Sequence, residues 1–86
     1  MDPASLKALR LIPGIGRSLA ADLYNLGFRR PADLSGADPE EMYRRLEALS
    51  GAHVDRCVLY AFRCAVYFAS HETHDPELLK WWRWKD

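Results

Sequence analysis

One short run, Pro13-Gly14-Ile15-Gly16, constrains the fold of this chain more than any other part of it. The segment Ile12-Pro13-Gly14-Ile15 has the pattern of a type II turn, because proline presets a φ of about −65° at its second position and glycine supplies the positive φ at its third. Gly16 then opens a helix, where a missing Cβ lets another molecule approach unpaired backbone amides. The run therefore predicts two helices joined by a glycine hairpin.

The start of the second helix suits an anion, because a helix N-terminus combines free N–H groups with the positive end of the helix dipole. Arg17 in the first turn opposes that dipole, which favours acidic residues there, so its charge indicates a ligand. Ser18, Arg29 and Arg30 follow in the sequence, and polar and basic side chains of this kind contact phosphates. We predict a phosphate site formed by the amides of Gly14, Ile15 and Gly16 with Arg17, Ser18, Arg29 and Arg30.

The same unit resembles the helix-hairpin-helix motif of DNA repair and recombination proteins. The motif has an apolar pair, a Pro-Gly-Ile-Gly hairpin and an alanine four residues after the second glycine, which here are Leu11, Ile12, residues 13–16 and Ala20. The resemblance implies binding of the DNA backbone without reading of the base sequence, in repair or the response to damage. The alternative is a structural connector between antiparallel helices, and a buried Ile15 fits both interpretations.

Residues 28–51 have the pattern of a second, weaker hairpin unit. Pro31–Leu34 is expected to form one helical turn, and Asp38-Pro39-Glu40-Glu41 begins a helix with Asp38 as its N-cap and Glu41 completing a capping box. Asp38 stands where a second glycine would lie, and the acidic first turn repels phosphate. We assign this unit a structural role, and Ser50-Gly51 ends its helix.

Residues 52–86 combine a long apolar helix with a tryptophan-rich end. The stretch from His53 to Ala69 is apolar on nearly every side, which predicts a central helix or one covered by a partner. Asp75-Pro76 begins another short helix. Trp81, Trp82 and Trp84 either close the core against the long helix, form a homodimer or partner surface, or stack on bases.

A resemblance to one family extends over nearly the whole chain. It is carried by the hairpin, by residues 55–60 and 62–67, and by Lys80-Trp81-Trp82-Arg83-Trp84-Lys85. This combination is similar to a small bacterial helix-hairpin-helix family labelled pathogenicity-locus or mitomycin-resistance proteins. The resemblance implies the fold and DNA binding, and it supplies no catalytic residue or cofactor.

The length and the helical patterns predict one all-α domain over residues 1–86, a compact bundle of about five short helices in three consecutive units, 1–27, 28–51 and 52–86. Twelve Lys and Arg balance twelve Asp and Glu, so the net charge lacks the basic excess that is usual in nucleic-acid binders. The charge is uneven, however. Residues 1–30 carry five basic and two acidic residues, whereas residues 31–55 carry two basic and six acidic ones. We therefore expect the protein to bind DNA through one face, and to bind it weakly as a monomer.

Several functions are disfavoured by the sequence. It has no signal peptide and no membrane-spanning stretch, which predicts a cytoplasmic protein. Cys57 and Cys64 lie about 10.5 Å apart along a helix, too far for a disulfide. His53, Cys57, Cys64 and His71 share one side of that helix, but their axial gaps are too long for one zinc ion. We predict no metal, no cofactor and no catalytic site, with protein–protein interaction as the alternative function.

Overall fold

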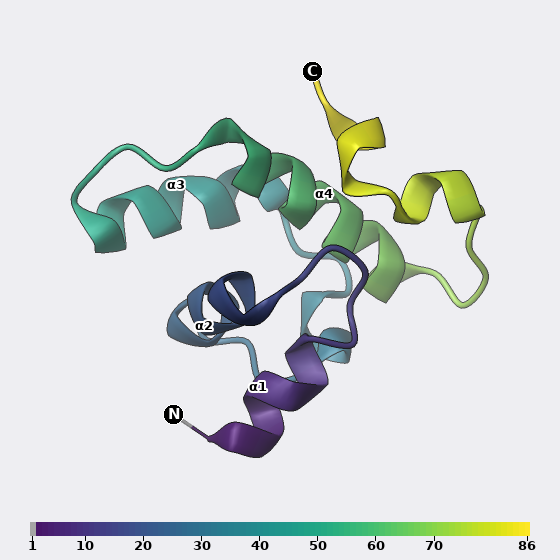
Figure 1. The fold of residues 1–86 in the computed structure, drawn as a ribbon, viewed down its shortest axis with the longest axis horizontal. Coiled ribbons are helices and arrows are strands. Elements are labelled where there is room, and N and C mark those ends of the chain that lie inside the picture. The colour runs from purple at the N-terminus through teal and green to yellow at the C-terminus, as the bar shows by residue number, and fades with distance from the viewer. Residues whose placement is uncertain (1) are drawn as a thin grey trace.

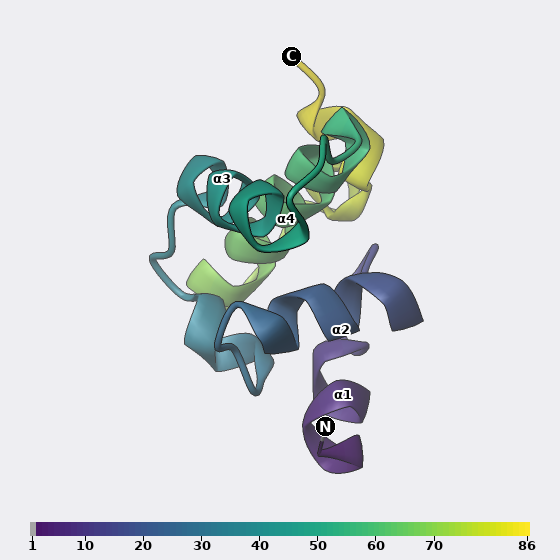
Figure 2. The ribbon, with the colours of Figure 1, turned by 90° about the vertical axis from the view of Figure 1, so that its left-hand side faces the viewer.

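The structure is a computed structural model that describes residues 2–86, and the predicted all-α fold is confirmed (Figure 1). The helices of this region lie in two groups. Helices α1 and α2 pack together at one end, and α3, α4 and the C-terminal turns form the other (Figure 2). The α-helices and the 3-10 turns (η) are α1 Pro3–Leu9, α2 Arg17–Asn25, η1 Pro31–Leu34, α3 Pro39–Ser50, α4 Arg56–Ser70, η2 Pro76–Leu79 and η3 Trp81–Trp84.

Aspartate side chains determine where three of the helices begin. The carboxylate of Asp2 accepts a hydrogen bond from the amide of Ala4 at 3.0 Å before α1, and Asp38 accepts one from Glu40 at 3.0 Å before α3. Asp55 does the same before α4. Such a cap stabilises a helix by about 1 kcal/mol, because it satisfies an amide that has no partner within the helix.

Helix α4 begins at Arg56, three residues later than the apolar pattern suggested. The amide of Cys57 donates to the Asp55 carboxylate at 2.8 Å, and this cap leaves His53 and Val54 outside the helix. At the other end, His71 already has an extended backbone. The expectation that His53 and His71 share a helix face with the cysteines is therefore wrong. Residues 2–86 contain no group of three or more side chains placed to hold a metal ion.

Helix α4 is the centre of the core, as its sequence predicted. Leu59, Phe62 and Ala65 are fully buried on it, and α3, η1 and η3 pack around it. Helix α2 contributes Ala20 and Leu23 from the other group. None of the helices in the described part of the chain has the length and apolar character needed to cross a bilayer.

The carboxylate of Asp86 links the C-terminal turns to α4 through two ion pairs. Asp86 pairs with Arg56 at 2.7 Å and with Arg63 at 2.9 Å. Arg63 also donates to the carbonyl of Trp84 at 2.8 Å, and the Trp84 indole N–H donates to Leu78 at 2.8 Å. These bonds hold the tryptophan-rich segment against the core.

The three tryptophans differ in their surroundings. Trp81 and Trp84 are half-buried, whereas Trp82 is 47% exposed. The core-closing role expected of the tryptophans therefore fits Trp81 and Trp84, and Trp82 is the one that a partner can reach.

The hairpin itself provides a test of the core. Ile12 is buried and its neighbour Leu11 is 73% exposed. Ile12→Ala should lower the free energy of unfolding by about 2–5 kcal/mol, because it leaves a cavity. Leu11→Ala should change it by less than about 0.5 kcal/mol. Urea unfolding measures both, and equal losses would contradict this arrangement of the core.

The Asp86 contacts predict a pH dependence of stability. Its hydrogen bonds to Arg56 and Arg63 lower the pKa of this carboxyl below its usual range. The folded state therefore favours the ionised form, so the stabilisation exists above about pH 4 and disappears as the pH falls through the lowered pKa. Asp86→Asn should lower Tm at pH 7 and converge with the wild type near pH 2. Glu72→Gln, an exposed control outside these contacts, should match the wild type throughout, and a constant Asp86→Asn deficit down to pH 2 would refute the assignment.

Candidate functional site

The hairpin between α1 and α2 is a turn pinned by two buried isoleucines. The amide of Ile15 donates to the carbonyl of Ile12 at 3.1 Å, and Gly14 has a φ of +83°. These are the hydrogen bond and the positive φ that a type II turn requires. Because Ile12 and Ile15 both point into the core, the following residues emerge at the surface.

The turn uses one of the amides that we assigned to the phosphate site. Since the Ile15 amide is bonded to Ile12, its predicted role as a free donor is wrong. The amides of Gly16, Arg17 and Ser18 have no acceptor among residues 2–86, and α2 has no side-chain cap. All three residues are exposed, so their donors remain available to a ligand.

The two glycines of the hairpin have different reasons to be glycine. Gly14 needs its positive φ, and a Cβ there would lie 3.4 Å from the Cβ of Trp81. Gly16 has a φ of −91° and a ψ of −168°, which any residue can adopt, and a Cβ there would meet nothing within 4 Å. The structural-connector interpretation therefore explains Gly14, and nothing within the described fold demands glycine at position 16.

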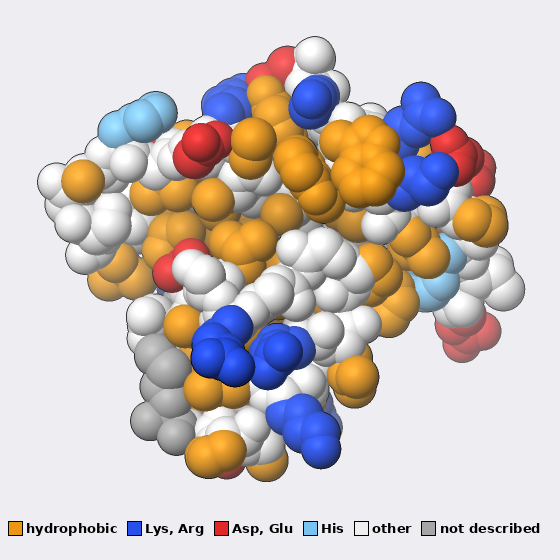
Figure 3. Space-filling view, in the orientation of Figure 1, with side chains coloured by type: hydrophobic (Ala, Val, Ile, Leu, Met, Phe, Trp, Pro, Cys, Tyr) orange, Lys and Arg blue, Asp and Glu red, His pale blue; other side chains and the backbone are white. Residues whose placement is uncertain are grey.

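Three cations accompany the open end of α2. Lys7, Arg10 and Arg17 are exposed, and none of them forms an ion pair within the described region. Lys and Arg side chains gather over α1 and the start of α2 in the lower part of Figure 3. The sequence interpretation did not assign Lys7 and Arg10 to the site, although the basic excess of residues 1–30 indicated them.

Arg29 and Arg30 lie apart from this group, so the structure does not bring them together with the start of α2. They follow the opposite end of α2, roughly 12 Å along its axis from Arg17. The Arg29 guanidinium donates to the carbonyls of Tyr24 at 2.8 Å and Phe28 at 3.1 Å. It thereby compensates the negative end of the helix dipole. Arg30 pairs with Asp33 at 3.4 Å.

The second hairpin unit contains an aspartate where the first has an open helix end. Asp38 accepts hydrogen bonds from the amides of Glu40 and Glu41 at 3.0 and 3.4 Å. The donors that begin α3 are thus occupied by the protein's own carboxylate, which agrees with the structural role that we assigned. Within the described residues, Glu41 does not return a hydrogen bond to the Asp38 backbone, so the expected capping box is incomplete.

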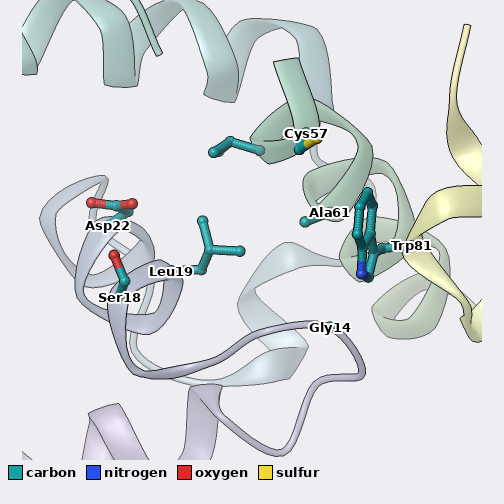
Figure 4. Close-up of a pocket in the computed structure, with 8 residues that line it drawn as sticks. Gly14, Ser18, Leu19, Asp22, Cys57, Ala61 and Trp81 are labelled. Atoms are coloured by element: carbon teal, nitrogen blue, oxygen red, sulfur yellow. The ribbon is translucent and has the colours of Figure 1, made fainter. Parts of the chain in front are cut away.

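A cleft of about 290 Å³ lies next to the hairpin, between α2 and α4 (Figure 4). Sequence reasoning missed it, because its walls come from three segments that are distant in the sequence, residues 14–22, residues 57–61 and Trp81. Its lining residues are Gly14, Ser18, Leu19, Asp22, Cys57, Val58, Ala61 and Trp81.

Neither cysteine is activated as a nucleophile. Cys57 borders the cleft, and its hydrogen bonds to Asp55 raise the pKa of the thiol. Burial raises the pKa of Cys64 to about 11. Both thiols are therefore protonated at neutral pH, and the thiolate needed for nucleophilic attack or metal binding is disfavoured.

The fold and the hairpin define a small all-α domain in which, among the α-helices of residues 2–86, α2 alone begins without a side-chain cap. The chain belongs to the Cdd1 pathogenicity-locus family, whose model matches residues 2–86. It is also similar to the mitomycin resistance protein McrB of Streptomyces lavendulae, at 32% identity over 76 residues, which cover 88% of this chain and 69% of that protein. No solved structure matches the chain.

One substitution made at both glycines distinguishes their roles. Gly14→Ser should lower the free energy of unfolding by about 1–2 kcal/mol, because a side chain opposes the left-handed backbone. Gly16→Ser should leave it unchanged or raise it by a few tenths of a kcal/mol, since serine is a good N-cap. Thermal unfolding of both variants is the measurement. A large loss at position 16 would mean that the fold itself needs this glycine.

Proposed function

We propose that this chain is a non-enzymatic, sequence-independent DNA-binding module that holds a backbone phosphate at the start of α2. The amides of Gly16, Arg17 and Ser18 are the donors in this proposal. The Arg17 side chain and the Ser18 hydroxyl complete the contact, and Lys7 and Arg10 attract neighbouring phosphates. The resemblance to helix-hairpin-helix proteins points to the same ligand.

The observation that carries the proposal is the contrast between the helix starts. Helices α1, α3 and α4 each have an aspartate whose carboxylate binds the first amides. Helix α2 has Gly16 at that position and no side-chain cap, followed by a cation instead of an acid. A capping aspartate here would compete with an incoming anion, so its absence keeps the donors free for phosphate.

The magnitudes indicate weak binding by a single copy. A hydrogen bond to a charged group contributes about 1.5–3 kcal/mol, and association costs consume much of the sum from two or three of them. Neutralising two or three phosphates gives a slope of about −2 to −3 for log K against log salt. Useful affinity then requires a dimer, a fused partner or a larger assembly.

An interaction module is the second candidate, and the exposed Trp82 favours it. Large apolar side chains are also exposed at Leu11 and Leu49, but the three lie on different segments of the chain. Sedimentation of the protein across a concentration series tests self-association. Trp82→Ser should abolish any dimer that uses this side chain, without altering DNA binding.

The DNA proposal is tested by giving α2 the cap that it lacks. Gly16→Asp should preserve or slightly raise Tm, because the new carboxylate caps the helix. It should also weaken binding of duplex and branched DNA by about 10- to 100-fold, because that carboxylate occupies the anion site. Fluorescence anisotropy with labelled DNA at low salt measures the affinity.

A charge reversal provides a matched control. Arg17→Glu should weaken binding and make the salt slope shallower by about 1. Arg44→Glu makes the same change of net charge on the exposed surface of α3 and should have a much smaller effect. If Gly16→Asp and Arg17→Glu remain folded and bind DNA as the wild type does, the proposal fails.

A further inference from the structure

The cleft beside the hairpin has the size of a site for a small ligand. Its volume of about 290 Å³ lies just below the range of roughly 300–1,000 Å³ typical of pockets for drug-sized molecules. Its walls come from the hairpin, from α2, from α4 and from η3. A ligand of one or two rings fits such a space better than a nucleotide or a peptide.

The charge of the cleft selects the charge of its ligand. Asp22 is the one charged residue in the lining, and its carboxylate has neither a hydrogen bond nor an ion pair with any residue from 2 to 86. Partial burial without a partner raises the pKa of this carboxyl. A cationic group placed beside it would compensate for the lost hydration, whereas an anion would be repelled.

The other residues that line the cleft favour a ligand that is apolar apart from its cationic group. Leu19, Val58 and Ala61 line the cleft with aliphatic groups, and Trp81 contributes an indole. In Figure 4, Asp22 and Leu19 lie on one side of the cavity and Trp81 on the other. A ring between Leu19 and Trp81 contacts apolar side chains on both sides. A short aliphatic linker then places the cationic group of the ligand beside Asp22.

We propose that this cleft binds a small organic amine with a flat apolar ring, its ammonium beside Asp22 and its ring against Trp81. The site differs from the phosphate contact in the sign of its charge, although Ser18 borders both. Its test contains no DNA, so a failure of the DNA proposal does not count against it. The basic side chain of another protein carries a similar cation without the ring, and the probes below distinguish it.

Three phenyl compounds of similar size test the contribution of charge, and n-butylamine, which has no ring, tests the contribution of the ring. We expect 2-phenylethylamine to shift the NMR signals of the Leu19, Asp22 and Ala61 amides with a Kd on the order of 1 mM, which is reasonable for so small a ligand. Neutral 2-phenylethanol should bind at least fivefold more weakly, and 3-phenylpropionate should not bind. Equal binding of all three would overturn the proposal. Equal binding of n-butylamine and 2-phenylethylamine would also overturn it, and would favour a basic side chain as the occupant.

Two variants assign the binding to this cleft. Asp22→Asn keeps the shape of the side chain and should weaken 2-phenylethylamine at least fivefold without changing the affinity for 2-phenylethanol. Val58→Phe fills the cleft and should abolish both. Glu72→Gln removes an exposed charge outside the cleft and should change neither. If Asp22→Asn or Val58→Phe is folded and binds 2-phenylethylamine like the wild type, the ligand lies elsewhere and the proposal is wrong.

Discussion

The burial of Ile12 and Ile15 on either side of Pro13-Gly14 is the constraint on which the functional part of this structure depends. Both side chains enter the core, so the turn between them cannot rotate away from it. The same anchoring brings the chain to the surface at Gly16, where the first residues of α2 are exposed. An apolar contact thus orients polar donors, which a flexible connector would leave in many directions.

The starts of the α-helices differ in a way that separates the stability of the fold from the recognition proposed for α2. Where a helix serves only the fold, an aspartate one residue before it satisfies the free amides locally. Helix α2 lacks the N-cap stabilisation of about 1 kcal/mol and is stabilised instead by the packing of Ala20 and Leu23 in the core. The acidic first turn of α3 has the opposite arrangement, and its electrostatics exclude the ligand that α2 is proposed to bind.

Features decided by neighbouring residues were predictable from the sequence. Local chemistry and apolar spacing predict the Pro-Gly turn, the start of α3 at Asp38-Pro39 and the central position of α4. The start of α4 was misplaced because the apolar pattern continues back to Val54, while the Asp55 cap determines where the helix begins. The type II turn itself implied that the Ile15 amide is occupied, so that error was avoidable.

Features that depend on tertiary contacts were not predictable from the sequence in this way. Arg29 follows the hairpin closely in sequence, but the rigid length of α2 carries it to the other end of the helix, where carbonyls bind it. The cleft needs α2, α4 and the C-terminal turns in their final places before it exists. Asp22 gave no signal in the sequence, because an unpaired carboxylate is unusual only once its surroundings are known.

The contact between Gly14 and Trp81 joins the first turn of the domain to one of its last. A chain that leaves the ribosome from its N-terminus can form the hairpin early, because the turn and its isoleucines are local. Its wall against Trp81 is completed only after Trp81 has been synthesised, because the two sides of this contact lie 67 residues apart in the sequence (81 minus 14). The cleft between the hairpin and the C-terminal turns is therefore incomplete until those turns have packed against α4.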